Sequence, residues 1–189
     1  DNGLYEQAEA TAQSRVDILD GRYGRTSIEV ANASDLLVRA LLLNGKGAAA
    51  GTRAIAELSV QTKELRLGAT HVDLAISLIN LGDCCVEAAD YRCALAALER
   101  AVALRATSSA TNGVPLAEAQ DHLGRALTAA GRHAEAVRTL ERSLQIKQSL
   151  LAASDVGIAR TLEALGLAHQ RRGDYSQAGV VVRRAARIQ

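Results

Sequence analysis

Apolar residues recur along the chain at steps of three and four, the spacing that gathers them on one face of an α-helix. One such stripe contains Leu78, Leu81, Gly82 and Cys85, and a second stripe starts at Ala94, a few residues further on. A helix with a single apolar face has to bury that face against a neighbour. The pattern therefore predicts antiparallel pairs of amphipathic helices joined by short polar turns.

The pattern repeats with a period of 42 residues. A leucine–glycine pair marks the same place in three units: Leu81-Gly82, Leu123-Gly124 and Leu165-Gly166. Because glycine has no side chain, its position in the apolar stripe predicts a close approach of the second helix to the first. Stacked pairs of this kind bury a continuous core.

The register extends towards the N-terminus with one irregularity. The step from Ala31 to Ala75 is 44 residues, and we place the two extra residues in the turn around residues 44–47. The predicted fold is all-α, a right-handed α-solenoid forming a single array over residues 1–189. Its predicted segments are an unpaired second helix at 4–22 and repeats at 28–66, 71–107, 113–149 and 155–189. Since the array opens on a second helix, we expect it to be a segment of a longer protein.

Composition agrees with a helical fold and excludes several partners. The chain contains one Pro and no Phe, Trp or Met, so Ala, Leu, Val and Ile have to fill its core. Its 22 Lys and Arg residues balance 21 Asp and Glu residues, and a net charge of +1 gives no general attraction to nucleic acid or to a membrane surface. Neither a transmembrane run nor a signal peptide is visible, so we predict a cytoplasmic protein. The excess of Arg over Lys and the abundance of Ala favour a bacterial source.

The repeat resembles the tetratricopeptide repeat, whose signature is W-x2-L-G-x2-Y, then A-x3-F, then A. In this sequence the signature reads Leu78-x2-Leu81-Gly82-x2-Cys85, Ala94-x3-Leu98 and Ala101. The 42-residue period is similar to that of the longer variant in kinesin light chains and many bacterial proteins. The resemblance implies a non-catalytic scaffold or recognition module, whose first helices line a concave groove that binds a protein or peptide.

Carried over by register, the resemblance also implies which residues face that groove. They are Asn32, Asp35, Arg39, Ile76, Ile79, Asn80, Asp83, Glu118, Asp121, His122, Arg125, Arg160, Glu163 and Arg171. The family's asparagine, which holds a peptide backbone, has a single counterpart here, Asn80. Charges of both signs are present, so we expect polar recognition of a protein surface. The simpler alternative is a solvated face without a partner.

Two other functions stay open at this point. The array is a candidate regulator or sensor for other domains of the same chain, such as a CHAT-type caspase-like protease, a Ser/Thr kinase or a signalling ATPase. Its end helices are also candidates for self-association with a second copy. In each case we expect the segment itself to be non-catalytic.

Two local features suggest nucleotide or metal binding, but neither is sufficient to predict it. Residues 45–51 contain G-x-G-x-x-x-G, yet a dinucleotide-binding loop needs a preceding strand, and the residues before it keep the helical register. An enlarged helix–helix turn is the preferred interpretation. The three cysteines, Cys84, Cys85 and Cys93, are an odd number and do not indicate a disulfide framework. We expect Cys85 to act as a small apolar filler, and we predict no metal site and no cofactor.

Overall fold

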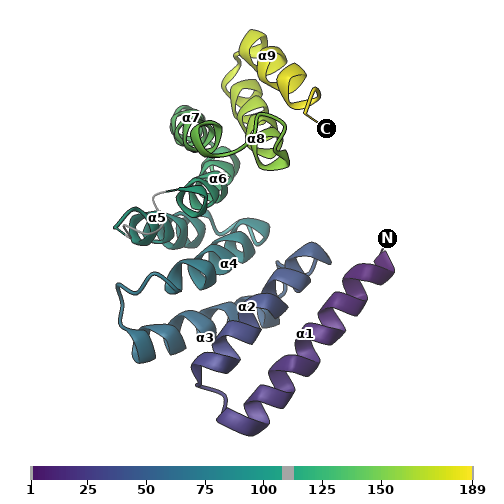
Figure 1. Cartoon of the computed structure of the whole chain (residues 1–189), viewed down its shortest axis with the longest axis vertical. Helices are drawn as coiled ribbons and strands as arrows, with labels where there is room; N and C mark the ends of the chain where they lie inside the picture. The colour runs from purple at the N-terminus through teal and green to yellow at the C-terminus, as the bar shows by residue number, and fades with distance from the viewer. Residues whose placement is uncertain (1, 108–112, 189) are drawn as a thin grey trace. The chain divides into compact units, whose positions relative to one another are not determined.

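The computed structural model describes residues 2–107 and 113–188, and all regular secondary structure in these two ranges is helical (Figure 1). The helices are α1 (Asn2–Tyr23), α2 (Ile28–Leu43), α3 (Ala50–Leu67), α4 (Leu74–Glu87), α5 (Tyr91–Thr107), α6 (Val114–Ala129), α7 (His133–Leu150), α8 (Val156–Arg172) and α9 (Tyr175–Ala185). The expected all-α helical repeat fold is confirmed. No helix in the described ranges is long and apolar enough to cross a membrane.

The helices divide into two compact units, one ending at Leu104 and the other beginning at Arg105. In unit 1, α1 packs against α2, α2 against α3 and α3 against α4, and α2 also contacts α4. In unit 2, α6 packs against α7, α7 against α8 and α8 against α9, and α6 also contacts α8. Each unit thus stacks antiparallel helices, with the first helices of successive pairs side by side. The boundaries of the four repeats stay a prediction.

Several helices begin and end at residue types that are common at helix ends. Ser27 caps α2 and Asp155 caps α8, each through its side chain, and Pro115 lies in the first turn of α6. Gly173 ends α8 with a left-handed φ of 92°, as expected of a glycine that follows a helix. Asp174, which precedes α9, makes no capping hydrogen bond through its side chain and instead accepts one from the side chain of Arg172.

The recurring glycines lie where helices approach closely, as the sequence predicts. A methyl group placed on Gly82 would be 2.5 Å from Cγ of Leu98, and one on Gly124 would be 2.5 Å from Cγ of Leu140. At Gly166 the corresponding distance to a valine of α9 is 2.6 Å. Real carbon atoms do not come so close, so only glycine permits the observed packing.

The glycine-rich segment after α2 is a turn of six residues, 44–49, longer than the other turns within helix pairs. Gly45 has a φ of 71°, a backbone conformation that favours glycine. The turn is anchored by the Thr52 hydroxyl, which donates to the Lys46 carbonyl at 2.8 Å, and by Lys46 itself, which pairs with Glu9 at 2.8 Å. The residues before it belong to α2, so the preceding strand that a dinucleotide-binding loop requires is not there.

Candidate interaction surface

The outward face of unit 1 carries exposed aliphatic side chains beside polar ones. On α2, Asn32, Leu36, Arg39 and Leu43 follow one stripe and are all exposed, Leu36 to 55% and Leu43 to 58%. On α4, Ile76 is 48% exposed. The two helices pack against each other. We call these five residues the unit 1 face.

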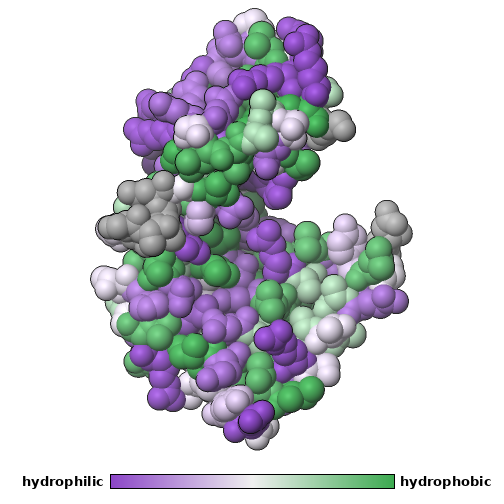
Figure 2. Space-filling view, viewed as in Figure 1, coloured by the Kyte–Doolittle hydropathy of each residue, from purple (hydrophilic) through white to green (hydrophobic). Residues whose placement is uncertain are grey.

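The corresponding positions of unit 2 are mainly charged. On α6 and α8 the exposed residues that the sequence predicted are Glu118, Arg125, Arg160, Glu163 and Arg171. Half-buried positions in the two units are Ile79, Asp83 and His122. The view in Figure 2 shows hydrophobic and hydrophilic residues intermixed over each unit. That these residues line a groove and recognise a protein surface stays a prediction.

Three residues predicted to face the groove do not do so. Asp35 is 5% exposed, Asn80 is 2% exposed and Asp121 is 7% exposed. Their side chains turn towards neighbouring helices, where they find hydrogen-bond partners. This corrects the expectation that Asn80 holds a peptide backbone, because its side-chain amide already forms a hydrogen bond inside the protein.

In unit 1 these buried groups form a network centred on Asp35. Its carboxylate accepts hydrogen bonds from Lys63 Nζ at 2.6 Å and from the Ser77 hydroxyl at 2.9 Å. Asn80 Nδ2 donates to the Asp35 backbone carbonyl at 3.0 Å, and Lys63 also donates to the Asp73 carbonyl at 3.3 Å. Burial raises the pKa of Asp35, and the ammonium group of Lys63 opposes that effect. The network links α2, α3 and α4.

Unit 2 contains an equivalent network, with Asp121 at its centre. Lys147 pairs with the Asp121 carboxylate, which also accepts from the Thr161 hydroxyl at 2.8 Å and the Ser143 hydroxyl at 2.5 Å. Lys147 donates to Thr161 at 2.9 Å and to the Gly157 carbonyl at 3.2 Å. Here α6, α7 and α8 are linked in the same way.

The sequence carries a signal for these networks that short-range periodicity does not reveal. Lys63 and Lys147 occupy the same place in the register, two repeats apart, each on the side of a second helix that packs inward. A buried lysine needs a buried acid, and the aspartates of the preceding helices supply it. In the repeat between them, Ile79 stands at the place of the aspartate and Arg105 at that of the lysine, so the pair does not recur there.

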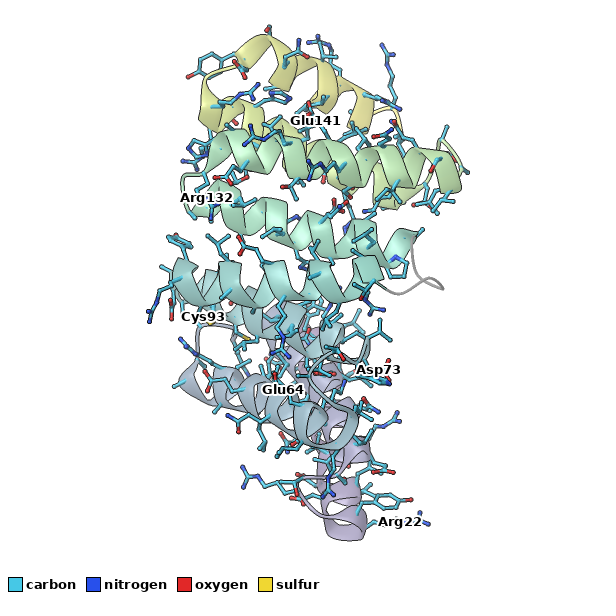
Figure 3. The ribbon with its side chains drawn as sticks, turned by 90° about the vertical axis from the view of Figure 1, so that its left-hand side faces the viewer. Arg22, Glu64, Asp73, Cys93, Arg132 and Glu141 are labelled. Carbon is cyan, nitrogen blue, oxygen red and sulfur yellow. A yellow bond between two sulfur atoms is a disulfide. The ribbon has the colours of Figure 1, made fainter. Side chains whose placement is uncertain are left out.

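The bonding of the cysteines differs from the prediction. Cys85 at the end of α4 and Cys93 at the start of α5 form a disulfide, with Cα atoms 5.9 Å apart, and Cys84 is free and buried. Figure 3 shows Cys93 at the end of the helix pair that carries the turn. The short turn brings two cysteines together that are eight residues apart, which an odd cysteine count did not suggest. Stable disulfides are typical of oxidising compartments and are rare in the cytoplasm. The cytoplasmic location therefore stays a prediction.

Comparison with known proteins finds a family match for the C-terminal part of the chain and structures of the same fold for the whole of it. Residues 115–189 match the family model described as tetratricopeptide repeat. No curated protein matches the sequence. A Podosopora anserina structure of nearly identical TPR-like repeats, from a protein assigned as a kinesin light chain, has a TM-score of 0.78 and 22% identity, covering 100% of this chain and 88% of that one.

Two further structures share the fold. BtubC (BKLC) from P. vanneervenii has a TM-score of 0.74 and 19% identity, covering 99% of this chain and 80% of that one. YrrB, a TPR protein with an unusual peptide-binding site, has a TM-score of 0.56 and 19% identity over 99% of this chain and 79% of its own. At such identities the likeness concerns the fold. Residues 115–189 therefore match the tetratricopeptide repeat family, and the chain as a whole shares the helical repeat fold of these solved structures.

Proposed function

We propose that this protein binds a segment of a partner protein on the exposed faces of its first helices, and that the unit 1 face supplies the apolar anchors. Tetratricopeptide repeats form a generally non-catalytic fold that presents surfaces to proteins and peptides. The observation that carries the proposal is the exposure of Leu36, Leu43 and Ile76 on two helices that pack against each other. Asn32 and Arg39 on the same face offer hydrogen-bond donors.

The chemistry of the unit 1 face favours a particular kind of segment. Burying one large aliphatic side chain contributes about 1.5–3 kcal/mol, so three such side chains can hold a partner that covers them together. Arg39 lies among them, and a guanidinium pairs well with a carboxylate. We therefore infer a partner segment that has apolar side chains on one side and at least one acidic residue.

Photo-crosslinking tests this surface directly. A photoreactive amino acid placed at position 36 or 76 of the otherwise intact chain is expected to capture a discrete partner in the native lysate. The matched control is position 65, because Leu65 is 84% exposed on α3, outside the unit 1 face. With the captured partner in hand, Leu36→Asp is expected to weaken its binding at least tenfold, since it removes an apolar contact and adds a repelling charge towards an acidic segment.

The outcome that contradicts the proposal is equally definite. Equal capture at positions 36, 76 and 65 would mean that the partner does not select this face. An unchanged affinity of the Leu36→Asp variant, compared with Leu65→Asp as its control, would exclude Leu36 as an anchor. Asn80→Ala is unsuitable as a surface probe, because it would break the buried network around Asp35.

A further inference from the structure

The turn between α4 and α5 gathers three donor groups of a kind that metal ions use. The Sγ atoms of Cys85 and Cys93 and a carboxylate oxygen of Asp90 all lie within 4.8 Å of one another. They come from the end of α4, from the turn and from the start of α5. The two sulfur atoms are bonded to each other as a disulfide, and the short turn keeps the two cysteine Cα atoms 5.9 Å apart. Cys85 is buried, whereas Asp90 and Cys93 are half-buried and face the outside of the turn.

We propose that, when the Cys85–Cys93 disulfide is reduced, this turn binds a zinc ion through the two thiolates and the Asp90 carboxylate. Zinc prefers four tetrahedral ligands, with sulfur and carboxylate oxygen among its usual donors, and a water molecule would complete the set. The same two sulfur atoms form the disulfide, so zinc and the disulfide exclude each other. The site is thus open only in the reduced protein.

Neighbouring groups already orient the carboxylate. The Cys93 amide donates to Asp90 Oδ1 at 3.1 Å, and Arg53 Nη1 donates to Oδ2, also at 3.1 Å. The same two contacts lower the pKa of Asp90, so the group is an anion at neutral pH. Such contacts behind a ligand fix its direction and tune its affinity for the metal.

The charges of the proposed site are compensated as well. Two thiolates, one carboxylate and a divalent cation leave one negative charge. Arg53, on α3, pairs with Asp90 and offsets that charge. The positive end of the α5 dipole acts in the same sense, because Cys93 lies in the first turn of that helix.

Cys84 is the third cysteine nearby, yet it does not compete. It packs among Val38 and Ala56 in the core, and it is not one of the three donor groups that lie within 4.8 Å of one another. This leaves Cys85 and Cys93 as the reacting pair and provides Cys84 as a natural control.

The redox step balances with an external dithiol as the reductant. One thiolate of the dithiol attacks a sulfur of the disulfide and forms a mixed disulfide, and its second thiolate displaces the protein sulfur. Two electrons pass to Cys85 and Cys93, which become thiols, while the dithiol becomes a cyclic disulfide. Zinc binding then releases the two thiol protons, because the ligands are thiolates.

The test compares the whole chain in its two redox states. After reduction with a dithiol and removal of that dithiol without air, calorimetric titration with zinc is expected to show one ion per chain and two protons released. The oxidised chain is expected to bind none. Among reduced variants, Cys93→Ser should weaken binding at least 100-fold, Asp90→Asn at least tenfold, and Cys84→Ser should match the wild type.

Cobalt(II) gives a second readout that does not depend on heat. With cobalt, the reduced wild type and Cys84→Ser are expected to show the thiolate-to-metal absorption of two sulfur ligands, and Cys93→Ser is expected to lose at least half of it. Circular dichroism of each variant establishes that its helices are formed. Absence of this absorption in the reduced wild type, or equal zinc affinity of Cys93→Ser and wild type, would overturn the proposal.

Discussion

Replacing Lys63 with methionine is expected to lower the free energy of unfolding by about 3–5 kcal/mol, because it leaves the buried Asp35 carboxylate without its cation. The two groups are 2.6 Å apart, and their side chains are only 2% and 5% exposed. Methionine keeps most of the volume of the lysine stem, so the loss reports the charge and not a cavity. Urea unfolding followed by circular dichroism measures it.

The effect of Lys63→Met should depend on pH in a defined direction. Burial already raises the pKa of Asp35, and removing Lys63 raises it further. A carboxyl group whose pKa is higher in the folded than in the unfolded protein destabilises the fold once it ionises. The cost is therefore greatest above the folded pKa and diminishes as the pH falls towards the ordinary value. We expect a smaller loss at about pH 5 than at about pH 8.

Two further variants provide the controls for this prediction. Lys46→Met removes an ion pair with Glu9 in which the lysine is 50% exposed, and it should cost no more than about 1 kcal/mol. The double variant Asp35→Leu with Lys63→Met removes both charges and should be more stable than Lys63→Met alone. If Lys63→Met behaved like Lys46→Met, the pair would not be a buried ion pair in solution.

Gly82→Val is the second substitution with a large expected effect, a loss of about 3 kcal/mol. Even a single methyl group at this position would be 2.5 Å from Cγ of Leu98, which is completely buried. Since Leu98 lies against the Gly82 backbone, α5 would have to move away from α4. Thermal unfolding of the variant should show a lower midpoint, while its helix content stays close to that of the wild type.

Gly21→Val is the matched control for crowding. Gly21 lies within α1, and nothing is found within 4 Å of the place of its missing side chain. Valine is a slightly better helix former than glycine, so this change should alter the stability by no more than about 0.5 kcal/mol. Equal losses for the two variants would mean that the close contact with Leu98 is not the cause of the loss at Gly82.

The candidate surface was predicted in part. The family resemblance, carried over by register, implied that Asn32, Arg39 and Ile76 lie on the outward side of the first helices, and all three are exposed. Asp35 and Asn80 lie at the edge of the same stripe, where a rotation of the helix decides whether a side chain points outward or inward. Asp35 accepts from Lys63 and Ser77, 28 and 42 residues away, and Asn80 donates to Asp35 across 45 residues, so short-range periodicity could not reveal these contacts.

The sequence by itself determined the helices, their pairing and the places where glycine is required. All three follow from local rules, because the 3.6-residue period defines a helix face and a repeat multiplies that evidence. Only the tertiary structure decided which polar groups meet, as Asp35 does with Lys63, and that Cys85 and Cys93 converge across one turn. Such meetings depend on how neighbouring helices rotate and approach each other, and that geometry is set by packing between distant parts of the chain.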